Sequence, residues 1–459
     1  METYNIIAEL RRSHNLSQEE FAERLFVTRQ AVSRWETGET IPNTDTLKLI
    51  SRTFDVSINS LLGEPRPGDK RYERMDAELV FHTGYHFPPL GIIATVGACE
   101  LGYKINAHLT NWAHGSIEFR DSFLIENECP RFASGDGKGI IGQSVRGMDL
   151  YFIVDVGNYS VKYKMFGEEN HMSPDDHFAD LKRLIQSVGG KAHRITIIMP
   201  LLYGGRQHKR NSRESLDCAM ALQELESMGV HTIIVFDAHD PQVQNAVPLT
   251  GVDNVMPHYQ VLKTLLREFP DIDTKNNFML VSPDEGAIGR NMYYSSVLGA
   301  PLVMYYKRRD YSKIENGRNP IVAHEYLGED PAGKTILIAD DQIASGDSML
   351  GIAYDLKRRG AGRIFITATY TLFTNGLDRF DQAFRDGTIT CVLGTNLSYR
   401  TPELLEREWF REVDCSKYIA YIIASLNHGI SFSALLDPHE KIKALLAAHG
   451  NHTAVQTVY

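Results

Sequence analysis

The chain has 459 residues, of which 43% are hydrophobic and 23% charged, a composition that argues against disorder and allows about two to four domains. Its formal net charge of −10 excludes a surface that binds nucleic acid everywhere, so any DNA contact must come from a local patch. The five scattered cysteines form no CxxC pair, and no apolar run approaches the length of a membrane span. We therefore expect a cytoplasmic protein with reduced thiols and no membrane partner.

Several short helical patterns follow one another closely at the start of the chain. Ser17 and the glutamate three residues later have the spacing of a capping box, which predicts a helix that begins near Ser17. Thr28 is the expected cap of the next helix, which would bury Val32 and Trp35 and end at Gly38. Short connections between such helices indicate a small helical bundle.

The second of these helices carries a polar face that suits the major groove of DNA. Arginine can donate two hydrogen bonds to guanine, glutamine can pair with adenine, and serine can contact a phosphate. These chemistries make DNA binding the leading interpretation of the bundle. The face consists of Arg29, Gln30, Ser33 and Arg34.

The segment Ile6–Leu62 resembles the helix-turn-helix domains of the phage-repressor type. The resemblance implies that Gln18 touches the DNA backbone, that Gln30 and the two arginines reach bases or phosphates, and that a dimer binds two half-sites. The alternative is an interaction or assembly module, because seven Lys and Arg are outnumbered by ten Asp and Glu in residues 1–64.

After a proline-containing, charged segment typical of a linker, short β-rich runs alternate with helical stretches from Gly91 onward. Such alternation predicts parallel sheets flanked by helices, and the strands are too many for one sheet. We therefore expect an α/β body of two stacked halves. The runs are GIIATVG, DLYFIVDVG, RITIIMP, HTIIVFDAH, NFMLVSPD, APLVMYY, KTILIADD, RIFITATY and ITCVLGTN.

The most specific signal is KTILIADDQIASGDSML, which predicts a buried strand ending in Asp340 and Asp341 and a loop that opens a helix. Loop amides and a helix N-terminus suit a phosphate, and adjacent carboxylates can accept hydrogen bonds from sugar hydroxyls or hold a metal. The alternative is an ordinary turn with Asp341 on the surface. The loop consists of Ala344, Ser345, Gly346, Asp347 and Ser348.

This signal resembles the phosphoribosyltransferase signature, and the body from about Gly91 to Leu436 is similar to the ribose-phosphate pyrophosphokinases. The resemblance implies two stacked phosphoribosyltransferase-like domains and a ribose 5-phosphate site at the loop. In that family the acidic pair is followed by aspartate, threonine, two small residues and threonine. Here Ala344 stands for the aspartate, and the acidic Asp347 stands for a small residue.

The resemblance also places an ATP site. The segment RITIIMPLLYGGRQHKR implies that Arg206 and Gln207 hold the nucleotide, although His208 stands where an aspartate is usual. In the less similar segment RFASGDGKG, Phe132 and Asp136 would contact the adenine of a neighbouring subunit. Extra residues here and in VGNYSVKYKMFGEENH suggest altered subunit packing or a reshaped adenine site.

Metal and transition-state groups complete the implied site. His239 and Asp284 match positions that the family places near Mg²⁺, and Lys307 and Arg309 match the start of its flexible catalytic loop. Fixed cations would stabilise the charge that builds on a transferring phosphoryl group. Taken alone, His239 could equally be a structural histidine, and the basic run could be a solvated face.

These interpretations divide the chain into five segments. They are a helix-turn-helix domain at 1–66, a linker at 67–87, an ATP-side domain at 88–266, a ribose 5-phosphate-side domain at 267–436 and a tail helix at 437–459.

Two functions remain open. One is an active enzyme that transfers pyrophosphate from Mg-ATP to ribose 5-phosphate, fused to a DNA-binding domain. The other is a weakened homologue that senses ribose phosphates or nucleotides and regulates transcription. The family's usual assembly implies a homo-oligomer, a dimer or a hexamer built from dimers.

Overall fold

The computed structural model describes residues 3–14, 16–25, 27–40, 42, 44–54, 87–114, 116, 118–309 and 321–456. The chain divides into two compact units, Met1–Leu79 and Val80–Tyr459. Apart from Phe87, the expected linker at 67–87 lies outside the described residues. No helix within the described ranges is long and apolar enough to cross a membrane.

The first unit is a bundle of short helices whose ends follow the predicted capping residues. The Ser17 hydroxyl accepts a hydrogen bond from the Glu20 amide, and Glu20 bonds back to Ser17, which confirms the capping box. Thr28 caps the next helix, and Gly38 ends it in the left-handed conformation, as predicted. The helices are α1 (Thr3–Ser13), α2 (Gln18–Arg24), α3 (Arg29–Thr37) and α4 (Thr44–Thr53).

One apolar cluster holds these helices together, and it leaves the polar face of α3 exposed. Val32 and Trp35 are buried, as predicted, against residues of the other three helices. Phe21 stacks on Phe54 with ring centroids 4.8 Å apart. On the side of α3 that faces away from this core, Arg29 is exposed. The core therefore orients α3 with its predicted DNA-reading side toward solvent.

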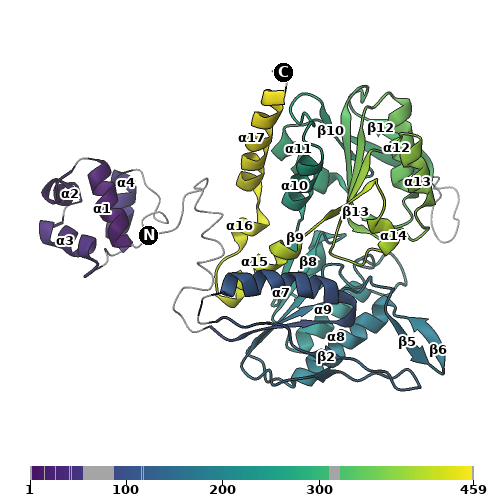
Figure 1. Cartoon of the computed structure of the whole chain (residues 1–459), viewed down its shortest axis with the longest axis horizontal. Helices are drawn as coiled ribbons and strands as arrows, with labels where there is room; N and C mark the ends of the chain where they lie inside the picture. Colours follow the sequence, from purple (N-terminus) through teal and green to yellow (C-terminus); the bar gives the residue numbers. More distant parts are fainter. Residues whose placement is uncertain are drawn as a thin grey trace. The chain divides into compact units, whose positions relative to one another are not determined.

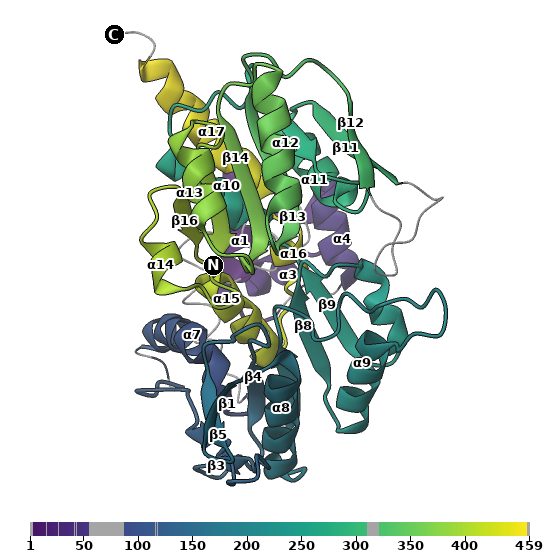
Figure 2. The same cartoon turned by 90° about the vertical axis from the view of Figure 1, so that its right-hand side faces the viewer.

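The second unit contains two large sheets, which lie one above the other in Figure 2. The lower sheet has the strand order β1-β4-β7-β8-β9 and is parallel throughout. Four of its strands, β1, β4, β7 and β8, are almost entirely buried because helices cover both faces, which explains their continuous apolar runs. The bounds are β1 (Leu90–Ala94), β4 (Asp149–Ile153), β7 (Arg194–Ile198), β8 (Thr232–Phe236) and β9 (Gly251–Val255).

The upper sheet has the order β12-β11-β10-β13-β14-β15-β16, so the predicted two α/β halves are confirmed. Every pairing in it is parallel except that of β11 with β12. The bounds are β10 (Phe278–Ser282), β11 (Leu302–Arg309), β12 (Ile321–Leu327), β13 (Thr335–Ile343), β14 (Ile364–Thr371), β15 (Cys391–Thr395) and β16 (Phe410–Val413).

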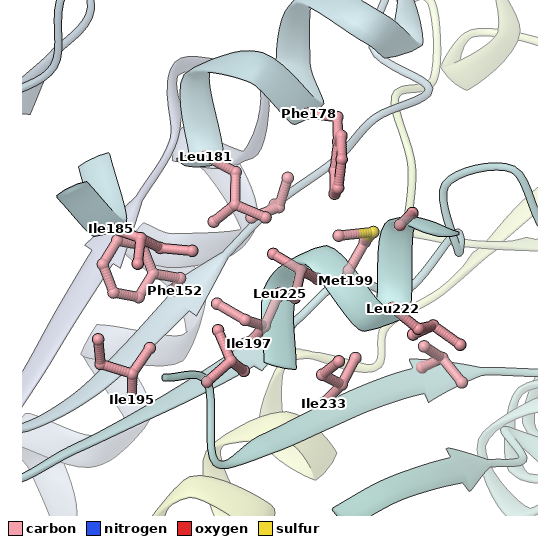
Figure 3. Close-up of a cluster of buried hydrophobic side chains, with 14 of the residues drawn as sticks. Phe152, Phe178, Leu181, Ile185, Ile195, Ile197, Met199, Leu222, Leu225 and Ile233 are labelled. Atoms are coloured by element: carbon pink, nitrogen blue, oxygen red, sulfur yellow. The ribbon is translucent and has the colours of Figure 1, made fainter. Parts of the chain in front are cut away.

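Helices pack on the sheets and build separate apolar cores (Figure 1). They are α7 (Cys99–Ala113), α8 (Pro174–Val188), α9 (Asp217–Ser227), α10 (His258–Glu268), α11 (Ile288–Leu298), α12 (Asp347–Arg358), α13 (Asp378–Arg385), α14 (Pro402–Leu405), α15 (Ser416–Asn427), α16 (Ser433–Leu436) and α17 (His439–Gln456). Figure 3 shows the lower core, where side chains of α8 and α9 meet those of the strands. The residues labelled there are Phe152, Phe178, Leu181, Ile185, Ile195, Ile197, Met199, Leu222, Leu225 and Ile233.

The structure corrects two expectations about the strands. β12 returns antiparallel to β11, so the upper sheet is not purely parallel. The strand β13 does not end at Asp341 but continues to Ile343, because Gln342 and Ile343 still pair with β14 and Ile343 is buried. The acidic pair therefore lies within the last part of the strand, and the loop begins at Ala344, as predicted.

Helix α15 crosses from the upper half to the lower half and packs against α7 (Figures 1 and 2), whereas the last helix, α17, packs against α10 and α11. The side chain of Asn427 donates to Asp149, and Arg194 donates to the Leu426 carbonyl over 2.8 Å. Arg194 also forms an ion pair with the fully buried Asp149. These contacts hold α15, which follows β16 of the upper sheet, on the lower sheet.

Candidate active site

The site lies where β8 of the lower sheet and β13 of the upper sheet end close together. A turn follows β8, and Asp237 adopts φ +45° in it, a conformation uncommon for a residue other than glycine. The backbone N–H of Asp237 donates to the Val255 carbonyl, and that of Ala238 donates to the Asn254 side chain. Strand β9 therefore shapes the turn that carries His239.

Asp237 is a buried anchor between the two halves. Its carboxylate accepts two hydrogen bonds from Arg290 Nε at 3.0 Å and one from Arg290 Nη2 at 2.6 Å, and Thr369 of β14 donates to it over 2.6 Å. Burial raises the pKa of Asp237, and the Arg290 charge opposes that rise. Next to it, the Tyr370 hydroxyl donates to the Phe236 carbonyl. The end of β8 is thus tied to the upper sheet.

Arg290 extends this network to the sugar-binding candidate Asp340. Its Nη1 lies 3.5 Å from Asp340 Oδ1, while the rest of the guanidinium contacts Asp237. Only 11% of the Arg290 side chain is exposed. The neighbouring Asn291 is buried and donates to the Ala339 carbonyl in β13, which holds α11 against the strand. One cation therefore positions carboxylates from both halves.

His239 and Asp341 make a second link between the halves. Nδ1 of His239 lies 2.9 Å from Oδ2 of Asp341, although the two residues are 102 positions apart in sequence. The hydrogen bond with Asp341 raises the pKa of His239, while the charge of Arg206 acts against this rise. The residues predicted to bind metal and sugar are thus brought into direct contact.

The adjacent carboxylates of Asp340 and Asp341 have different environments. Burial raises the pKa of Asp340, and the negative charges of Asp341 and Asp284 raise it further. Burial alone would also raise the pKa of Asp341, but the His239 hydrogen bond and the Arg290 charge bring it below its usual value. These surroundings favour ionisation of Asp341 over ionisation of Asp340.

The predicted phosphate loop joins β13 to α12. Gly346 caps the helix in the left-handed conformation, with φ +81°. The Thr374 amide donates to the Ala344 carbonyl, so the loop after β14 supports it. The Asp347 carboxylate accepts a hydrogen bond from the Ser345 hydroxyl and forms an ion pair with Arg379 of α13. Ser348 lies in the first turn of α12.

Asp284 lies on the turn between β10 and α11. Its Oδ1 accepts a hydrogen bond from the Ala287 amide at 3.2 Å, and its backbone carbonyl accepts one from the buried Ser282 hydroxyl. A Cβ added to Gly286 would lie 3.3 Å from Asp284 Oδ1, so the turn is tight. The negative charge of Asp284 raises the pKa of Asp340, so Asp284 lies near the Asp340 carboxylate.

The predicted ATP residues of the loop after β7 lie beside His239. Arg206 is exposed and near enough for its charge to act on the His239 imidazole. The Gln207 side chain donates to the Ser215 carbonyl at 2.9 Å and so closes its own loop. His208 pairs with Asp240 at 3.2 Å, and its ring centroid lies 5.5 Å from that of His239.

Lys307 and Arg309 lie at the end of β11, where the backbone of Lys307 is opposite His324 of β12. The strand pairing is irregular between Arg308 and Arg309. The rest of the expected catalytic loop, 310–320, lies outside the described residues. The positions of these two cations in the catalytic step therefore stay a prediction.

Phe132 and Asp136 lie at the other edge of the lower sheet. They belong to the loop between β2 (Asn127–Glu128) and β3 (Ile140–Ile141). Leu124, just before β2, forms a bridge with Ile92 of the edge strand β1, whereas His239 follows β8, three strands away in the sheet. Phe132 is 56% exposed. The structure of one chain does not bring this pair to the other site residues. The Ala133 carbonyl accepts from the Phe166 amide of the hairpin β5 (Lys162–Met165) and β6 (Glu168–His171), so the two sets of extra residues pack on each other.

In the first unit, three of the predicted DNA-contacting residues are exposed and two are partly covered. Gln18 donates to Glu36 over 2.9 Å, and Glu36 also binds Arg11, so the Gln18 side chain is engaged within the bundle. Arg29, Gln30 and Arg34 are exposed, and Ser33 is half-buried.

Sequence reasoning did not identify Arg290, Asp237 or Thr369 as members of the site. The signal for Asp237 was present, since it ends an apolar run directly before Ala238 and His239. Arg290 stands within FMLVSPDEGAIGR, but a lone arginine in a helix predicts an exposed side chain. Only the fold shows that this arginine is surrounded by three acids, one from the turn after β8 and two from β13.

The acidic group fits a hard divalent cation that is completed by its ligand. Within the described part of the chain, no cluster of three or more His, Cys, Asp and Glu is placed to hold a metal ion by itself. Mg²⁺ commonly binds one or two carboxylates and takes its other ligands from water and substrate phosphates. Of the residues predicted to bind metal, His239 contacts Asp341, and Asp284 is near enough to Asp340 for its charge to act on it, so this group offers a partial donor set.

Comparisons with known proteins cover both units. Residues 7–61 match the model of a helix-turn-helix family. Residues 90–229 match the N-terminal domain of ribose phosphate pyrophosphokinase, and residues 252–385 match the phosphoribosyl transferase domain.

Individual relatives agree with these models. Ribose-phosphate pyrophosphokinase A of Dictyostelium discoideum is 25% identical over 309 residues, covering 66% of this chain and 88% of that protein. A ribose-phosphate pyrophosphokinase of Shewanella oneidensis is 26% identical over 309 residues, covering 66% and 89%. The crystal structure of phosphoribosylpyrophosphate synthetase from Mycobacterium smegmatis superimposes with a TM-score of 0.59 at 20% identity, over 74% of this chain and 99% of that one. The last comparison supports the fold.

Proposed function

The body of this chain belongs to the ribose-phosphate pyrophosphokinase family, and from that premise we propose that it transfers a pyrophosphoryl group from ATP to the 1-hydroxyl of ribose 5-phosphate. The products are phosphoribosyl pyrophosphate and AMP. The observation that supports this proposal best is the contact of His239 with Asp341, because these residues come from the two halves to which the proposal assigns the nucleotide and the sugar. The helix-turn-helix unit attaches a DNA-binding module to this body.

The reaction forms a bond between the sugar oxygen and the β-phosphorus and breaks the bond between that phosphorus and the oxygen that leaves with AMP. The 1-hydroxyl releases its proton to water. In this proposal Asp340 and Asp341 accept hydrogen bonds from the ribose hydroxyls, and the loop from Ala344 to Ser348 holds the 5-phosphate. Arg206 binds the nucleotide phosphates, and Arg290 keeps the carboxylates in place.

Magnesium held by Asp341 and Asp284, beside His239, would neutralise negative charge on the ATP phosphates. Lys307 and Arg309 are proposed to stabilise the charge that builds on the β-phosphoryl oxygens in the transition state. Their place at the end of β11, directly before 310–320, suits residues that approach the substrate on a closing loop.

AMP formation tests this function directly. Purified full-length protein is incubated with ATP, ribose 5-phosphate and Mg²⁺, and AMP is measured over time. We expect AMP only when the sugar phosphate is present. Lys307→Ala should reduce the rate by about a hundredfold or more, whereas the exposed Lys443→Ala on α17 serves as the control and should leave it unchanged. Wild-type rates equal to those of Lys307→Ala would reject the proposal.

A specific observation favours a second function, that of a ligand-sensing transcription regulator. Ala344 stands where the family has an aspartate in the phosphate loop, and a sensor can lose such a group while it still binds its ligand. In this case ribose 5-phosphate or phosphoribosyl pyrophosphate should change the affinity of the protein for its own promoter DNA. A DNA-binding curve that is unchanged by both ligands would count against regulation.

DNA recognition by α3 is tested separately from the body. Selection of DNA at two salt concentrations should identify an operator whose affinity falls with salt, because phosphate contacts release counterions. Replacing Arg29 and Arg34 with alanine should weaken binding by about tenfold or more. Arg12→Ala is the matched control, since Arg12 is an exposed arginine on another helix. Equal losses in both proteins would mean that α3 does not read DNA.

A further inference from the structure

The phosphate loop contains a negative charge of its own. Asp347 is the first residue of α12, where ribose-phosphate pyrophosphokinases have a small residue. Its Oδ2 accepts a hydrogen bond from the Ser345 hydroxyl at 3.2 Å, and 51% of its side chain is exposed. The carboxylate thus lies against the same loop and helix N-terminus that the proposed function assigns to the sugar phosphate.

The cation that pairs with Asp347 comes from another helix. Arg379 of α13 forms an ion pair with Asp347 Oδ1. Its neighbour Phe380 is fully buried, and a Cβ added to Gly346 would overlap the Phe380 ring. Helix α13 therefore packs directly on the loop, so the approach of Arg379 follows from the fold and is not a chance meeting of two long surface side chains.

The Asp347 carboxylate would compete with a bound phosphate for the same partners. The Ser345 hydroxyl and the Arg379 guanidinium are both groups that a phosphate would bind, and both are engaged by the Asp347 carboxylate. A phosphate dianion entering the loop would also be repelled by that carboxylate. An uncharged sugar hydroxyl at the same place would be repelled less by Asp347 and would depend less on Arg379.

Building on the proposed function, we propose that Asp347 sets the selectivity of the sugar site by competing with the 5-phosphate, and that Arg379 is the cation they share. When ribose 5-phosphate binds, Arg379 transfers its hydrogen bonds from Asp347 to the phosphate. The site consequently distinguishes ribose 5-phosphate from ribose less strongly than a loop with a small residue at this position. The site also needs a higher concentration of ribose 5-phosphate to fill than a loop with a small residue at this position would need.

Calorimetric titration of the full-length protein with ribose 5-phosphate and with ribose tests this inference. Asp347→Asn keeps the size of the side chain and removes its charge, so it should bind ribose 5-phosphate about tenfold more tightly while its affinity for ribose stays unchanged. Asp347→Ser should act in the same direction. Asp378→Asn is the matched control, because it removes the same charge from the first turn of α13 beside Arg379.

The role of Arg379 is separated from mere neutralisation of Asp347 by combining variants. Arg379→Gln should weaken ribose 5-phosphate binding by about tenfold in the Asp347→Asn background as well as in the wild type. If Arg379 only neutralised Asp347, the substitution would have no effect once Asp347 was uncharged. All these side chains are exposed, and circular dichroism with thermal unfolding verifies that each variant is folded.

The outcomes separate this inference from the proposed function. Ribose 5-phosphate binding that is equally tight in the wild type, Asp347→Asn and Asp347→Ser overturns the inference and leaves the proposed function standing. A gain of the same size in Asp378→Asn also overturns it, because the effect would then be one of general charge. Binding in none of the proteins, at concentrations that sustain AMP formation by a related pyrophosphokinase, rejects the sugar-phosphate site itself and both proposals with it.

Discussion

Arg290 of α11 and Asp237 at the end of β8 form a buried ion pair that joins the two α/β halves, with Nη2 and Oδ1 2.6 Å apart. Replacing Arg290 with methionine would leave the Asp237 carboxylate buried without its countercharge. We expect the free energy of unfolding to fall by about 3 kcal/mol. Urea unfolding measures the loss.

Substitution of Arg290 should also disturb the ligand site, because Arg290 lies beside Asp340. Ribose 5-phosphate binding should weaken in Arg290→Lys, which keeps the charge but not the paired contacts with the carboxylate. Arg267→Met on α10 is the control, since its side chain is 63% exposed. Unfolding curves that coincide for Arg290→Met and Arg267→Met would show that the pair does not hold the halves together.

Asp155, directly after β4, predicts a pH dependence of the second unit. It is buried and accepts hydrogen bonds from the Ser398 hydroxyl and the Tyr399 amide of the upper half. Burial raises its pKa from 3.8 to about 6. Because protonation is easier in the folded state, this group favours folding fully below about pH 4, and the contribution is lost as the pH rises through 6.

The size of this effect follows from the shift, and about two pKa units correspond to about 3 kcal/mol. Thermal unfolding between pH 4 and 7 should therefore show less change in Asp155→Asn than in the wild type. Asp121→Asn, at an exposed position, should retain the wild-type profile. An Asp155→Asn profile parallel to that of the wild type would mean that the carboxyl does not titrate in this range.

Glu36 predicts the opposite pH dependence in the helix-turn-helix unit. It is 8% exposed, pairs with Arg11 at 2.6 Å and accepts a hydrogen bond from Gln18. Burial alone would raise the pKa of Glu36, but the hydrogen bonds from Arg11 and Gln18 lower it below its usual value. The pair therefore stabilises this unit above about pH 4.5, and the stabilisation is lost as the pH falls through the lower folded pKa.

Glu36→Gln should cost about 1–2 kcal/mol at neutral pH, because it leaves the largely buried Arg11 guanidinium without a counterion. It should also flatten the acid side of the stability profile. Glu39→Gln is the comparison, since Glu39 is 65% exposed in its ion pair with Arg34. The loss of α-helical signal from this unit on titration to pH 3 measures both effects, and identical acid midpoints for the two variants would contradict the prediction.

Local signals were enough to predict the parts of the fold that local chemistry determines. Ser17, Thr28 and Gly38 cap helices as expected because capping depends on a residue and its next few neighbours. The buried parallel strands were also predictable, since strands covered on both faces are continuous apolar runs. Strands β9 and β16 were missed because Gly251–Val255 contains Asp253 and Asn254, and Phe410–Val413 contains Arg411 and Glu412, which interrupt such a run.

The contacts across the site could not be predicted in the same way. The partners His239 and Asp341 are 102 residues apart, and Arg290 and Asp237 are 53 residues apart. Nothing in a linear pattern gives these distances, because they depend on how the two sheets meet. The family resemblance supplied His239 and Asp341 separately, and it supplied no reason to expect that Arg379 would reach the phosphate loop.

Gly346 offers a test of the phosphate loop that is independent of charge. Its φ of +81° lies in the left-handed region, and a Cβ at this position would overlap the Phe380 ring. Gly346→Ala must therefore strain the backbone and displace the loop from α13, which should lower the free energy of unfolding by about 1–3 kcal/mol. The affinity for ribose 5-phosphate should fall more than tenfold, because the loop amides proposed to bind the phosphate move with Gly346.

Gly351→Ala is the matched control, because Gly351 lies within α12 and a Cβ there would meet open space. Alanine in a helix interior should stabilise the protein by about 0.5–1 kcal/mol and leave sugar-phosphate binding unchanged. A double variant of Gly346→Ala with Phe380→Leu should recover part of the stability, since the smaller leucine relieves the overlap but not the backbone strain. If Gly346→Ala bound ribose 5-phosphate as tightly as Gly351→Ala, the phosphate would have to lie elsewhere than at the N-terminus of α12.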